Sequence, residues 1–404
     1  MKKYVIVGCG HRSITAYAVP MVKSYSDCVE LVGVLDTNHK RAALVSEYVD
    51  KSIRVFDDFD AMLETTMPDT VIVVTKDSAH DEYIIKALEA GCDVISEKPL
   101  TTTFEKANAI LEAKNRTGKD VTVTFNLRYH PVFKYLKEKV YAGIIGKVLS
   151  VHYDWFLDRS HGADYFRRWH RIRENSGSLL VHKSTHHFDI ANWILEEDPV
   201  SVNAFGTRRF YGDKSKQHSE RCKTCEYKDK CGFYFDLGAN EDYKKLYLDC
   251  EQEDGYFRDK CVFSDEIDIE DSVSVNVQYS GGAVMSYSLT AHSPIEGHNI
   301  ILNGTDGRLE YHSLDNQIIL YNAKGERLEL PVPDEKEGTH GGADPEMQNM
   351  LFRGHEPEPI GQEADLRAGL MSIGIGMAAN ISMKEGRQVK LSEFYPDYLL
   401  EKKQ

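Results

Sequence analysis

The segment "KKYVIVGCGHRS", residues 2–13, decides the fold of the N-terminal part of the chain. Its apolar, β-branched run ends in a glycine turn, which is typical of a buried strand that leads into a helix. Gly8, Gly10 and Ser13 form a G-x-G-x-x-S pattern. Small residues there let the backbone approach a pyrophosphate at the helix N-terminus, although the pattern alone also fits a plain tight turn.

Further strands and helices alternate along the next hundred residues. The apolar runs are "VELVGVLD" (29–36), "DTVIVVT" (69–75), "CDVISEKP" (92–99) and "VTVTFNLRY" (121–129). Between them, segments such as "DEYIIKALEAG" (81–91) have helical spacing and close on glycine. This alternation predicts parallel βαβ units with right-handed crossovers.

After about residue 129 the pattern changes to half-buried strands with short turns, such as "DSVSVNVQYS" and "AVMSYSLTAHS". We therefore predict an α/β fold with two domains. Residues 1–128 would form a Rossmann domain with a doubly wound parallel sheet. Residues 129–404 would form an α+β domain with a large, mostly antiparallel open sheet. A polar, cysteine-rich insertion is predicted at about 212–267.

The composition limits the class of protein. With 404 residues, 41% hydrophobic and 28% charged, the chain reads as an ordinary soluble globular protein of two domains. A formal net charge of −15 argues against a nucleic-acid partner, which would need a basic face. We expect no membrane span, no export signal and a cytoplasmic location, in which the eight cysteines stay reduced unless they bind metal.

Asp36 bears on the choice of cofactor. It ends the second strand at the distance expected for a carboxylate that binds the adenosine ribose hydroxyls. An acid there favours NAD over NADP because it repels a 2′-phosphate. Arg41 lies one helical turn further on and keeps NADP open.

The segment "VTKDSAHDEYIIKALEAGCDVISEKPL" (74–100) strongly resembles the Gfo/Idh/MocA family of glucose–fructose oxidoreductase and inositol dehydrogenase. The resemblance extends over nearly the whole chain. It implies that Lys98 of the "EKP" motif contacts both the nicotinamide ribose and the substrate and helps to relay a proton. It also implies a cis Pro99 and a homo-oligomer, a dimer or tetramer, that packs through the open sheet. The predicted cofactor-binding residues are Gly8, Gly10, His11, Arg12, Ser13, Asp36, Thr75, Lys76, His80, Glu97, Lys98 and Asn126.

The segment "LLVHKSTHHFDIANW" (179–193) matches the family pattern D-x-G-x-H-x-x-D-x-x-x-W at His186, Asp189 and Trp193. His182 replaces the first aspartate and Ser184 replaces the glycine. Positions 182 and 186 are one helical turn apart, so both imidazoles are expected to point the same way. Without an aspartate at 182, we expect Lys98 to lack a nearby anion.

Three interpretations of this histidine pair are open: a metal site, acid–base groups for a sugar hydroxyl, or a structural imidazole packed against Trp193. No carboxylate nearby completes a metal set, which favours acid–base work. We predict Lys98, His182 and His186 as catalytic residues. His187 and Asp189 are expected to be structural.

Arginine and aromatic groups suit sugars, which offer hydroxyls and apolar CH faces. The predicted substrate-binding residues are Arg128, Tyr129, Arg168, Trp169, Lys183 and His340. His340 belongs to "THGGADPEM" (339–347), which resembles a loop near the sugar pocket in some relatives, including NAD-dependent glycoside hydrolases.

The insertion holds the pattern C-x2-C-x5-C at Cys222, Cys225 and Cys231, followed by Cys250 and Cys261. Thiolate ligation of zinc or of an iron–sulfur cluster by Cys222, Cys225, Cys231 and Cys261 would stabilise so polar a segment. Reduced, unligated thiols are an equal alternative. Either way we expect the insertion to be structural and remote from hydride transfer.

These patterns together predict an NAD-dependent oxidoreductase that transfers a hydride between the nicotinamide and a hydroxyl carbon of a sugar or cyclitol. The alternative is an NAD-dependent glycoside hydrolase that uses transient oxidation and elimination. A sensor of sugars or dinucleotides on the same fold is a third, non-enzymatic class. The sequence leaves open which sugar is used, which carbon loses hydride and with what stereochemistry.

Overall fold

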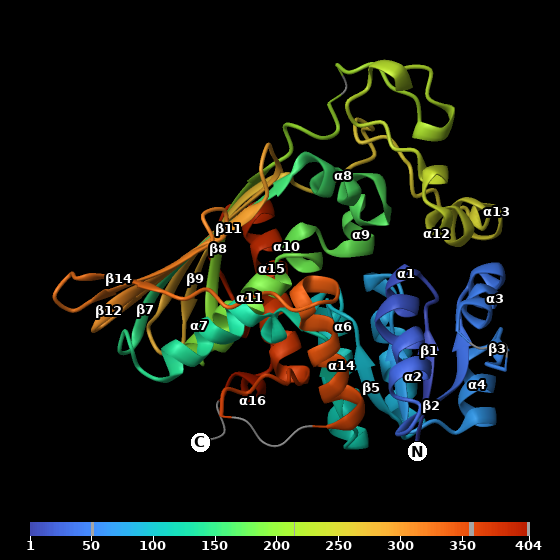
Figure 1. The fold of residues 1–404 in the computed structure, drawn as a ribbon, viewed down its shortest axis with the longest axis horizontal. Coiled ribbons are helices and arrows are strands. Elements are labelled where there is room, and N and C mark those ends of the chain that lie inside the picture. Colours follow the sequence, from blue (N-terminus) through green and yellow to red (C-terminus); the bar gives the residue numbers. More distant parts are fainter. Residues whose placement is uncertain (50–51, 214, 355–358, 402–404) are drawn as a thin grey trace.

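Two β-sheets organise the molecule, seen in a computed structural model that describes residues 1–49, 52–213, 215–354 and 359–401 (Figure 1). The first sheet has six parallel strands in the order β3-β2-β1-β4-β5-β6. They are β1 (Lys2–Val7), β2 (Val29–Leu35), β3 (Val55–Phe56), β4 (Thr70–Val73), β5 (Asp93–Ser96) and β6 (Val121–Val123). This order confirms the doubly wound Rossmann sheet and places a ligand crevice at the carboxyl ends of β1 and β4, where the order reverses.

The helices of this part cover both faces of the sheet and begin at identifiable caps. They are α1 (His11–Ser13), which continues through η1 (Ile14–Ala18) into α2 (Val19–Ser24), then α3 (His39–Tyr48), α4 (Phe59–Thr66), α5 (His80–Glu89) and α6 (Phe104–Thr117). The side chains of Asn38, Asp58 and Thr103 accept hydrogen bonds from the first turns of α3, α4 and α6. Such caps satisfy amides that the helix itself leaves unpaired.

The second sheet has nine strands in the order β14-β13-β12-β11-β7-β10-β9-β8-β15. The strands are β7 (Val148–Asp158), β8 (Pro199–Thr207), β9 (Ser272–Tyr279), β10 (Val284–Ser293), β11 (Gly297–Gly304), β12 (Gly307–His312), β13 (Gln317–Asn322), β14 (Arg327–Leu330) and β15 (Val389–Lys390). All neighbours are antiparallel except β7 and β10. The predicted large, mostly antiparallel sheet is confirmed.

Helices cover one face of this sheet (Figure 1). The long α15 (Leu366–Glu385) packs against β8, α10 and α11, and α11 also contacts α7. The helices of this part are α7 (Pro131–Tyr141), α8 (Arg159–Arg167), α9 (Arg173–Ser176), α10 (Leu179–His182), α11 (Thr185–Leu195), α14 (Ala343–Arg353), α15 and α16 (Asp397–Leu400). Within the described ranges, no helix combines the length and apolar character needed to cross a bilayer.

The cysteine-rich insertion leaves the sheet between β8 and β9 and reaches over the Rossmann helices α1 and α3 (Figure 1). It carries α12 (Glu241–Tyr243), η8 (Lys244–Leu248) and α13 (Glu251–Asp254), and we call residues 212–267 the insertion lobe. Asn38 Nδ2 donates to the Cys250 carbonyl at 2.9 Å, and Tyr48 donates to Asp242 at 2.6 Å. The lobe is therefore docked on the Rossmann domain.

The chain also returns to the Rossmann domain through α14. Gln348 Nε2 donates to the Ala16 carbonyl at 3.0 Å, and the ring of Phe352 packs edge-on against Tyr4. The domain boundary at residue 128 thus remains a prediction. Segments that follow it in the sequence also pack against the first domain.

Candidate active site

A cavity of about 1400 Å³ lies between the two sheets at the carboxyl ends of β1, β2, β4 and β5. Most of the predicted site residues line it, although they come from distant parts of the sequence. Those residues are Gly8, Gly10, His11, Arg12, Asp36, Thr75, Lys76, His80, Glu97, Lys98, Asn126, Arg168, Trp169, His182, Lys183, His186 and His340. The predicted Ser13, Arg128 and Tyr129 are absent from this lining.

The glycine turn is shaped by a close approach of two strands. Gly8 has φ +92°, and a Cβ there would lie 2.5 Å from the carbonyl oxygen of Val74, just after β4, so a side chain is excluded. Ser13 donates to the Gly10 carbonyl at 2.8 Å and stabilises the turn from behind. This explains why Ser13 does not reach the cavity. The turn leaves the backbone beside Gly10 and His11 facing the cavity, where a pyrophosphate fits.

Asp36 closes the end of this crevice. Its carboxylate accepts hydrogen bonds from the amides of Cys9 and Asn38 at 2.7 and 2.8 Å. Arg41 pairs with Asp36 at 3.3 Å and with Asp254 of the insertion lobe at 2.8 Å. Arg41 is thus held by two carboxylates.

The insertion lobe also reaches the N-terminus of the first Rossmann helix, at the glycine turn of the crevice. The Tyr247 hydroxyl accepts a hydrogen bond from the His11 amide at 3.0 Å. The Arg258 guanidinium stacks 4.3 Å from the centre of the Tyr247 ring and 4.7 Å from that of Tyr243. Arg258 is only 5% exposed, lines the cavity, and its Nε atom has no hydrogen-bond partner among the described residues.

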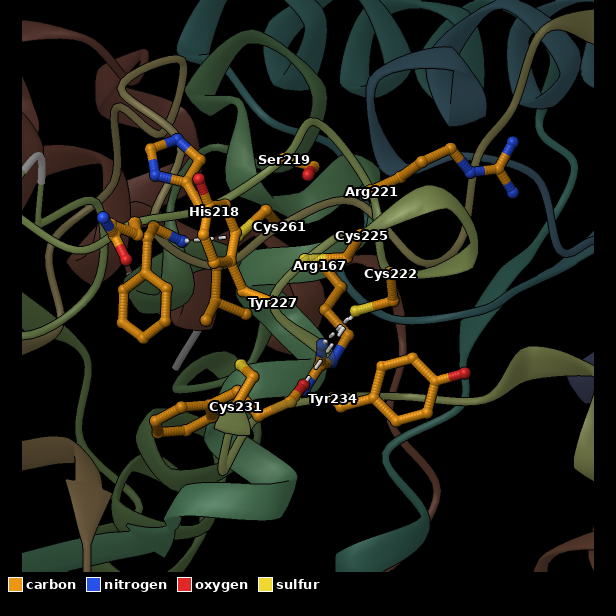
Figure 2. A pocket seen from close by; sticks show the side chains of 14 residues that line it. Arg167, His218, Ser219, Arg221, Cys222, Cys225, Tyr227, Cys231, Tyr234 and Cys261 are labelled. Atoms are coloured by element: carbon orange, nitrogen blue, oxygen red, sulfur yellow. Dashed lines mark hydrogen bonds between the residues drawn. The ribbon is translucent and has the colours of Figure 1, made fainter. Parts of the chain in front are cut away.

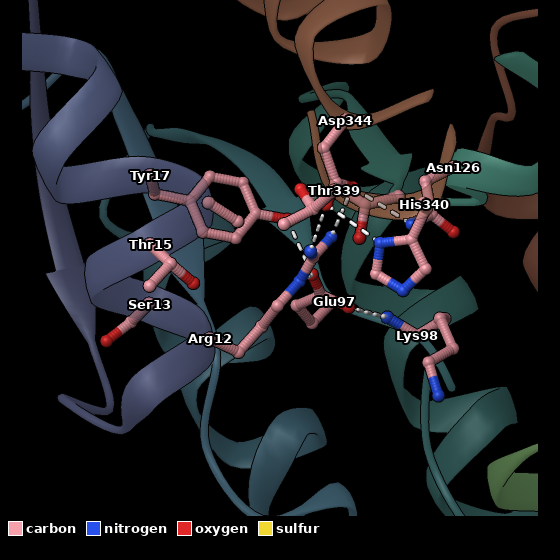
Figure 3. Close-up of polar contacts among 12 residues, drawn as sticks. Arg12, Ser13, Thr15, Tyr17, Glu97, Lys98, Asn126, Thr339, His340 and Asp344 are labelled. Atoms are coloured by element: carbon pink, nitrogen blue, oxygen red, sulfur yellow. Dashed lines mark hydrogen bonds and ion pairs between the residues drawn. The ribbon is translucent and has the colours of Figure 1, made fainter. Parts of the chain in front are cut away.

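A polar network fixes the floor of the cavity (Figure 3). Arg12 binds Glu97 at 2.6 Å and Asp344 at 2.8 Å. Asn126 and His340 converge on the same Asp344 carboxylate, both at 2.9 Å. Burial by itself would raise the pKa of Glu97, but the Arg12 guanidinium brings it below its ordinary value. These predicted residues therefore hold one another in place.

Lys98 projects from the "EKP" turn toward the second domain. The Lys98–Pro99 peptide bond is cis, and the ammonium donates to the His182 carbonyl at 2.9 Å. His80 supports the turn, because its two ring nitrogens lie 2.8 and 3.1 Å from the carbonyl oxygens of Pro99 and Thr75. Burial lowers the pKa of Lys98 below its ordinary value.

His182 and His186 do not share one helix. Helix α10 ends at His182 and α11 begins at Thr185. The Ser184 amide bonds back to the Leu179 carbonyl and the His186 amide to the Lys183 carbonyl, so the regular i→i−4 pattern is broken between them. Both imidazoles nevertheless line the cavity. Burial lowers the pKa of each well below its usual value, so both are neutral.

Asp77 is the functional candidate that the sequence interpretation missed. Its carboxylate lies 2.6 Å from His182 Nδ1 and is only 3% exposed. Burial raises the pKa of Asp77, while the neighbouring Lys98 ammonium acts in the opposite direction. Glu97, whose own pKa is lowered, also acts to raise the pKa of Lys98, so the expectation that Lys98 lacks a nearby anion is wrong. The available signal was an acid two residues beyond the strand that ends in Thr75, at the edge of the sheet where ligands bind.

Two of the predicted substrate-binding residues have structural roles instead. Arg128 makes a two-pronged ion pair with Asp189 at 2.7 and 2.8 Å, buried beneath the cavity wall. Tyr129 packs with Ala343 and Met347 of α14. Their side chains are engaged in joining elements of the fold, which corrects the prediction that they bind substrate.

The substrate side of the cavity has an aromatic wall. Trp169 stacks on His170 at 3.7 Å, and His170 contacts His182 at 4.1 Å between ring centres. The sequence did not single out Trp155 on β7 or His298 on β11, whose rings stack at 5.9 Å and which also line the cavity. Strand residues of this kind carry no motif, and only the register of β7 with β11 brings them together.

The four cysteines predicted as metal ligands surround a separate small pocket in the insertion lobe (Figure 2). Cys222, Cys225, Cys231 and Cys261 all line it, whereas Cys250 does not. In the part of the chain that the structure describes, no group of three or more His, Cys, Asp or Glu side chains is placed to hold a metal ion. The prediction of zinc or an iron–sulfur cluster therefore gains no support.

Comparison with known proteins agrees with this geometry. Residues 2–125 match the family model described as "Oxidoreductase family, NAD-binding Rossmann fold", and residues 137–391 match "Oxidoreductase family, C-terminal alpha/beta domain". The chain belongs to the Gfo/Idh/MocA oxidoreductase family. As a member of that family it is an NAD-dependent dehydrogenase with a Rossmann domain for the dinucleotide.

Individual relatives of this Gfo/Idh/MocA protein are similar over most of its length. It is 36% identical to "Putative oxidoreductase YteT" of Bacillus subtilis, covering 98% of this chain and 99% of the relative. It is 26% identical to the scyllo-inositol 2-dehydrogenase (NAD(+)) of the same organism, covering 82% and 80%. The solved structure of levoglucosan dehydrogenase in complex with NADH and levoglucosan has a TM-score of 0.70 at 19% identity, covering 96% and 99%.

Proposed function

We propose that the protein oxidises a secondary hydroxyl of a sugar or cyclitol, or reduces the corresponding ketone, with NAD as hydride carrier. The observation that carries this proposal is one cavity that holds the glycine turn and Asp36 at one end and Lys98 with two neutral imidazoles at the other. The sugar and cyclitol dehydrogenases among its relatives support the substrate class.

The crevice residues fit a dinucleotide. Gly8 and Gly10 would admit the pyrophosphate, Asp36 would accept hydrogen bonds from the adenosine ribose, and Lys98 would lie toward the nicotinamide end; all four line the cavity. A nicotinamide bound there supplies the acceptor or donor of hydride. Every proton, by contrast, is managed by side chains of this chain.

Lys98 is the proposed base. As a neutral amine it receives the proton of the reacting hydroxyl, and its lowered pKa makes that form accessible nearer neutral pH. With Asp77 ionised, Nδ1 of His182 is the donor in their hydrogen bond, so Nε2 is free to accept from a substrate hydroxyl. His186 is the second imidazole proposed to contact the substrate hydroxyl.

NAD is the proposed cofactor in preference to NADP. Asp36 repels a 2′-phosphate, and Arg41 cannot easily turn toward one because Asp36 and Asp254 already hold it. Calorimetric titration with both dinucleotides tests this preference, and tighter binding of NADP would contradict it.

The experiment for the proposed chemistry compares Lys98→Ala and His186→Ala with Lys86→Ala, an exposed lysine outside the cavity. The two cavity variants should lose turnover by roughly 10²–10⁴-fold, the usual cost of losing acid–base help, while NAD affinity changes little. The control should match the wild type. Near-wild-type turnover in either cavity variant would contradict the assigned roles.

The glycoside hydrolase alternative gains no support from the relatives reported above.

We further propose a cytoplasmic homo-oligomer, a dimer or tetramer. The cytoplasmic location is proposed because all eight cysteines are free thiols. The oligomer is proposed because the second sheet leaves one face open, on which Phe205 is 72% exposed. Light scattering of the purified protein tests the assembly, and a monomer at micromolar concentration would contradict it.

A further inference from the structure

Lys183 is a second lysine on the substrate side of the cavity. It follows His182 in the break between α10 and α11, and its ammonium lies 5.0 Å above the centre of the Trp155 ring. Among the described residues, no carboxylate forms an ion pair with it. An aromatic face offers a cation only a weak partner, so the charge of Lys183 is largely uncompensated.

The acidic side chains on this wall already contact other side chains. The pairs are Asp77 with His182 at 2.6 Å, Asp164 with Arg168 at 2.6 Å, and Glu296 with His161 at 2.8 Å. Glu296 still attracts Lys183, but Lys98 repels it. Asp77 and Glu97 act on Lys98, whereas Lys183 has no carboxylate in ion-pair contact among the described residues.

The imidazoles around Lys183 add no negative charge. Imidazoles of α11 and β11 face the same space: His186, His187 and His298. Burial lowers the pKa of all three, so they are neutral at physiological pH. Neutral hydroxyls alone would leave Lys183 unpaired, whereas an anion would match it.

We propose that Lys183 binds a carboxylate of the substrate, so that the enzyme acts on an acidic sugar such as a uronate or an aldonate. This inference deepens the proposed function and rests on it. A carboxylate beside Lys183 would form a charge-assisted hydrogen bond and also relieve the repulsion from Lys98.

The pH dependence of binding follows from the same geometry. Burial, with the added repulsion of Lys98, lowers the pKa of Lys183 to about 7. Only the ammonium form attracts a carboxylate. Affinity for an acidic sugar, relative to the matched neutral sugar, should therefore be highest below that pKa and fall above it until the preference is lost.

The experiment titrates the enzyme–NADH complex with matched probes, following cofactor fluorescence: galacturonate with galactose, glucuronate with glucose, and gluconate with glucitol. At a pH below the Lys183 pKa, the acid of at least one pair should bind roughly tenfold more tightly than its neutral partner, the effect of one charge-assisted contact. Lys183→Met should abolish that preference while leaving NADH affinity intact, and Lys183→Arg should keep it. Lys86→Met serves as the exposed control.

Equal or tighter binding of the neutral member in every pair overturns the inference, as does an acid preference that survives in Lys183→Met. Turnover separates this failure from failure of the proposed function. Oxidation of neutral sugars without acid preference would leave the dehydrogenase intact and remove the acidic substrate. Acid preference without any turnover would support the carboxylate site at Lys183 and contradict the proposed dehydrogenase activity.

Discussion

The contact between Asp77 and His182 defines how the site differs from the family pattern. The pattern places an aspartate at position 182, near the lysine of the "EKP" motif. Here a histidine occupies that position, and Asp77 supplies the carboxylate from the other domain at 2.6 Å. A carboxyl group beside position 182 is thus retained, and it contacts the imidazole of His182.

Asp77→Asn tests the role of this carboxylate. Asp77 acts to raise the pKa of Lys98, so its removal should lower that pKa and make the free amine available at lower pH. The acidic limb of sugar oxidation should move to lower pH, and turnover should fall by roughly 10²–10⁴-fold because the orientation of His182 is lost.

Steady-state pH profiles of Asp77→Asn and of Asp81→Asn provide the measurement. Asp81 pairs with Lys106 at 2.9 Å and does not line the cavity, so its variant should overlay the wild type. A limb that moves to higher pH in Asp77→Asn would contradict the account.

At the residue scale the sequence predicted what local motifs encode. The glycine turn, Asp36 and Lys98 each follow a strand at a fixed spacing, and all of them line the cavity. Arg128 was misassigned because nothing in the sequence shows that Asp189, 61 residues away, is its partner. Pairings of that kind depend on tertiary contacts.

The insertion lobe is the element that sets this chain apart. Its cysteine pattern suggested a metal site. The residues that approach the cofactor crevice are Tyr247 and Arg258, which follow the first three cysteines in the sequence. The Tyr247 hydroxyl accepts the hydrogen bond of the His11 amide, and the Arg258 guanidinium lies over the Tyr247 ring. The Nε atom of Arg258 has no hydrogen-bond partner among the described residues, and a guanidinium at this point is suited to the pyrophosphate.

We predict that Arg258→Met weakens binding of NAD and ADP-ribose by roughly 10–100-fold, the usual effect of losing a hydrogen bond to a charged group. Adenosine affinity should change little because adenosine has no pyrophosphate. Arg258→Lys should retain part of the affinity, since the charge remains. Calorimetric titration measures all three ligands, and unchanged NAD affinity in a folded Arg258→Met variant would show that the guanidinium only packs against the tyrosines.

Whether an insertion folds away from a domain or onto it depends on contacts between distant segments. The bonds of Asn38 and Tyr48 to the lobe span about two hundred residues, and no local pattern announces them. The longer central strands were predictable, in contrast, because alternating and β-branched runs follow directly from burial. The edge strands β3, β14 and β15 are short and were not predicted.

At the scale of the whole molecule, the cavity exists because the two sheets meet with their polar edges facing each other. The Rossmann sheet presents the carboxyl ends of its strands, and β7, β11 and α11 close the opposite side with Trp155, His298 and His186. Neither half holds a complete site, so catalysis requires both.

The most direct test of the central claim is the stoichiometry of turnover. Wild-type enzyme is incubated with NAD and a panel of acidic sugars, neutral sugars, cyclitols and glycosides, and NADH, oxidised product and released free sugar are measured together. The account predicts NADH and oxidised product in equal amounts, no free sugar from glycosides, and a roughly 10²–10⁴-fold slower formation of both products with Lys98→Ala. Free sugar released from a glycoside without net NADH, or no turnover of any compound by enzyme that binds NAD, would contradict it.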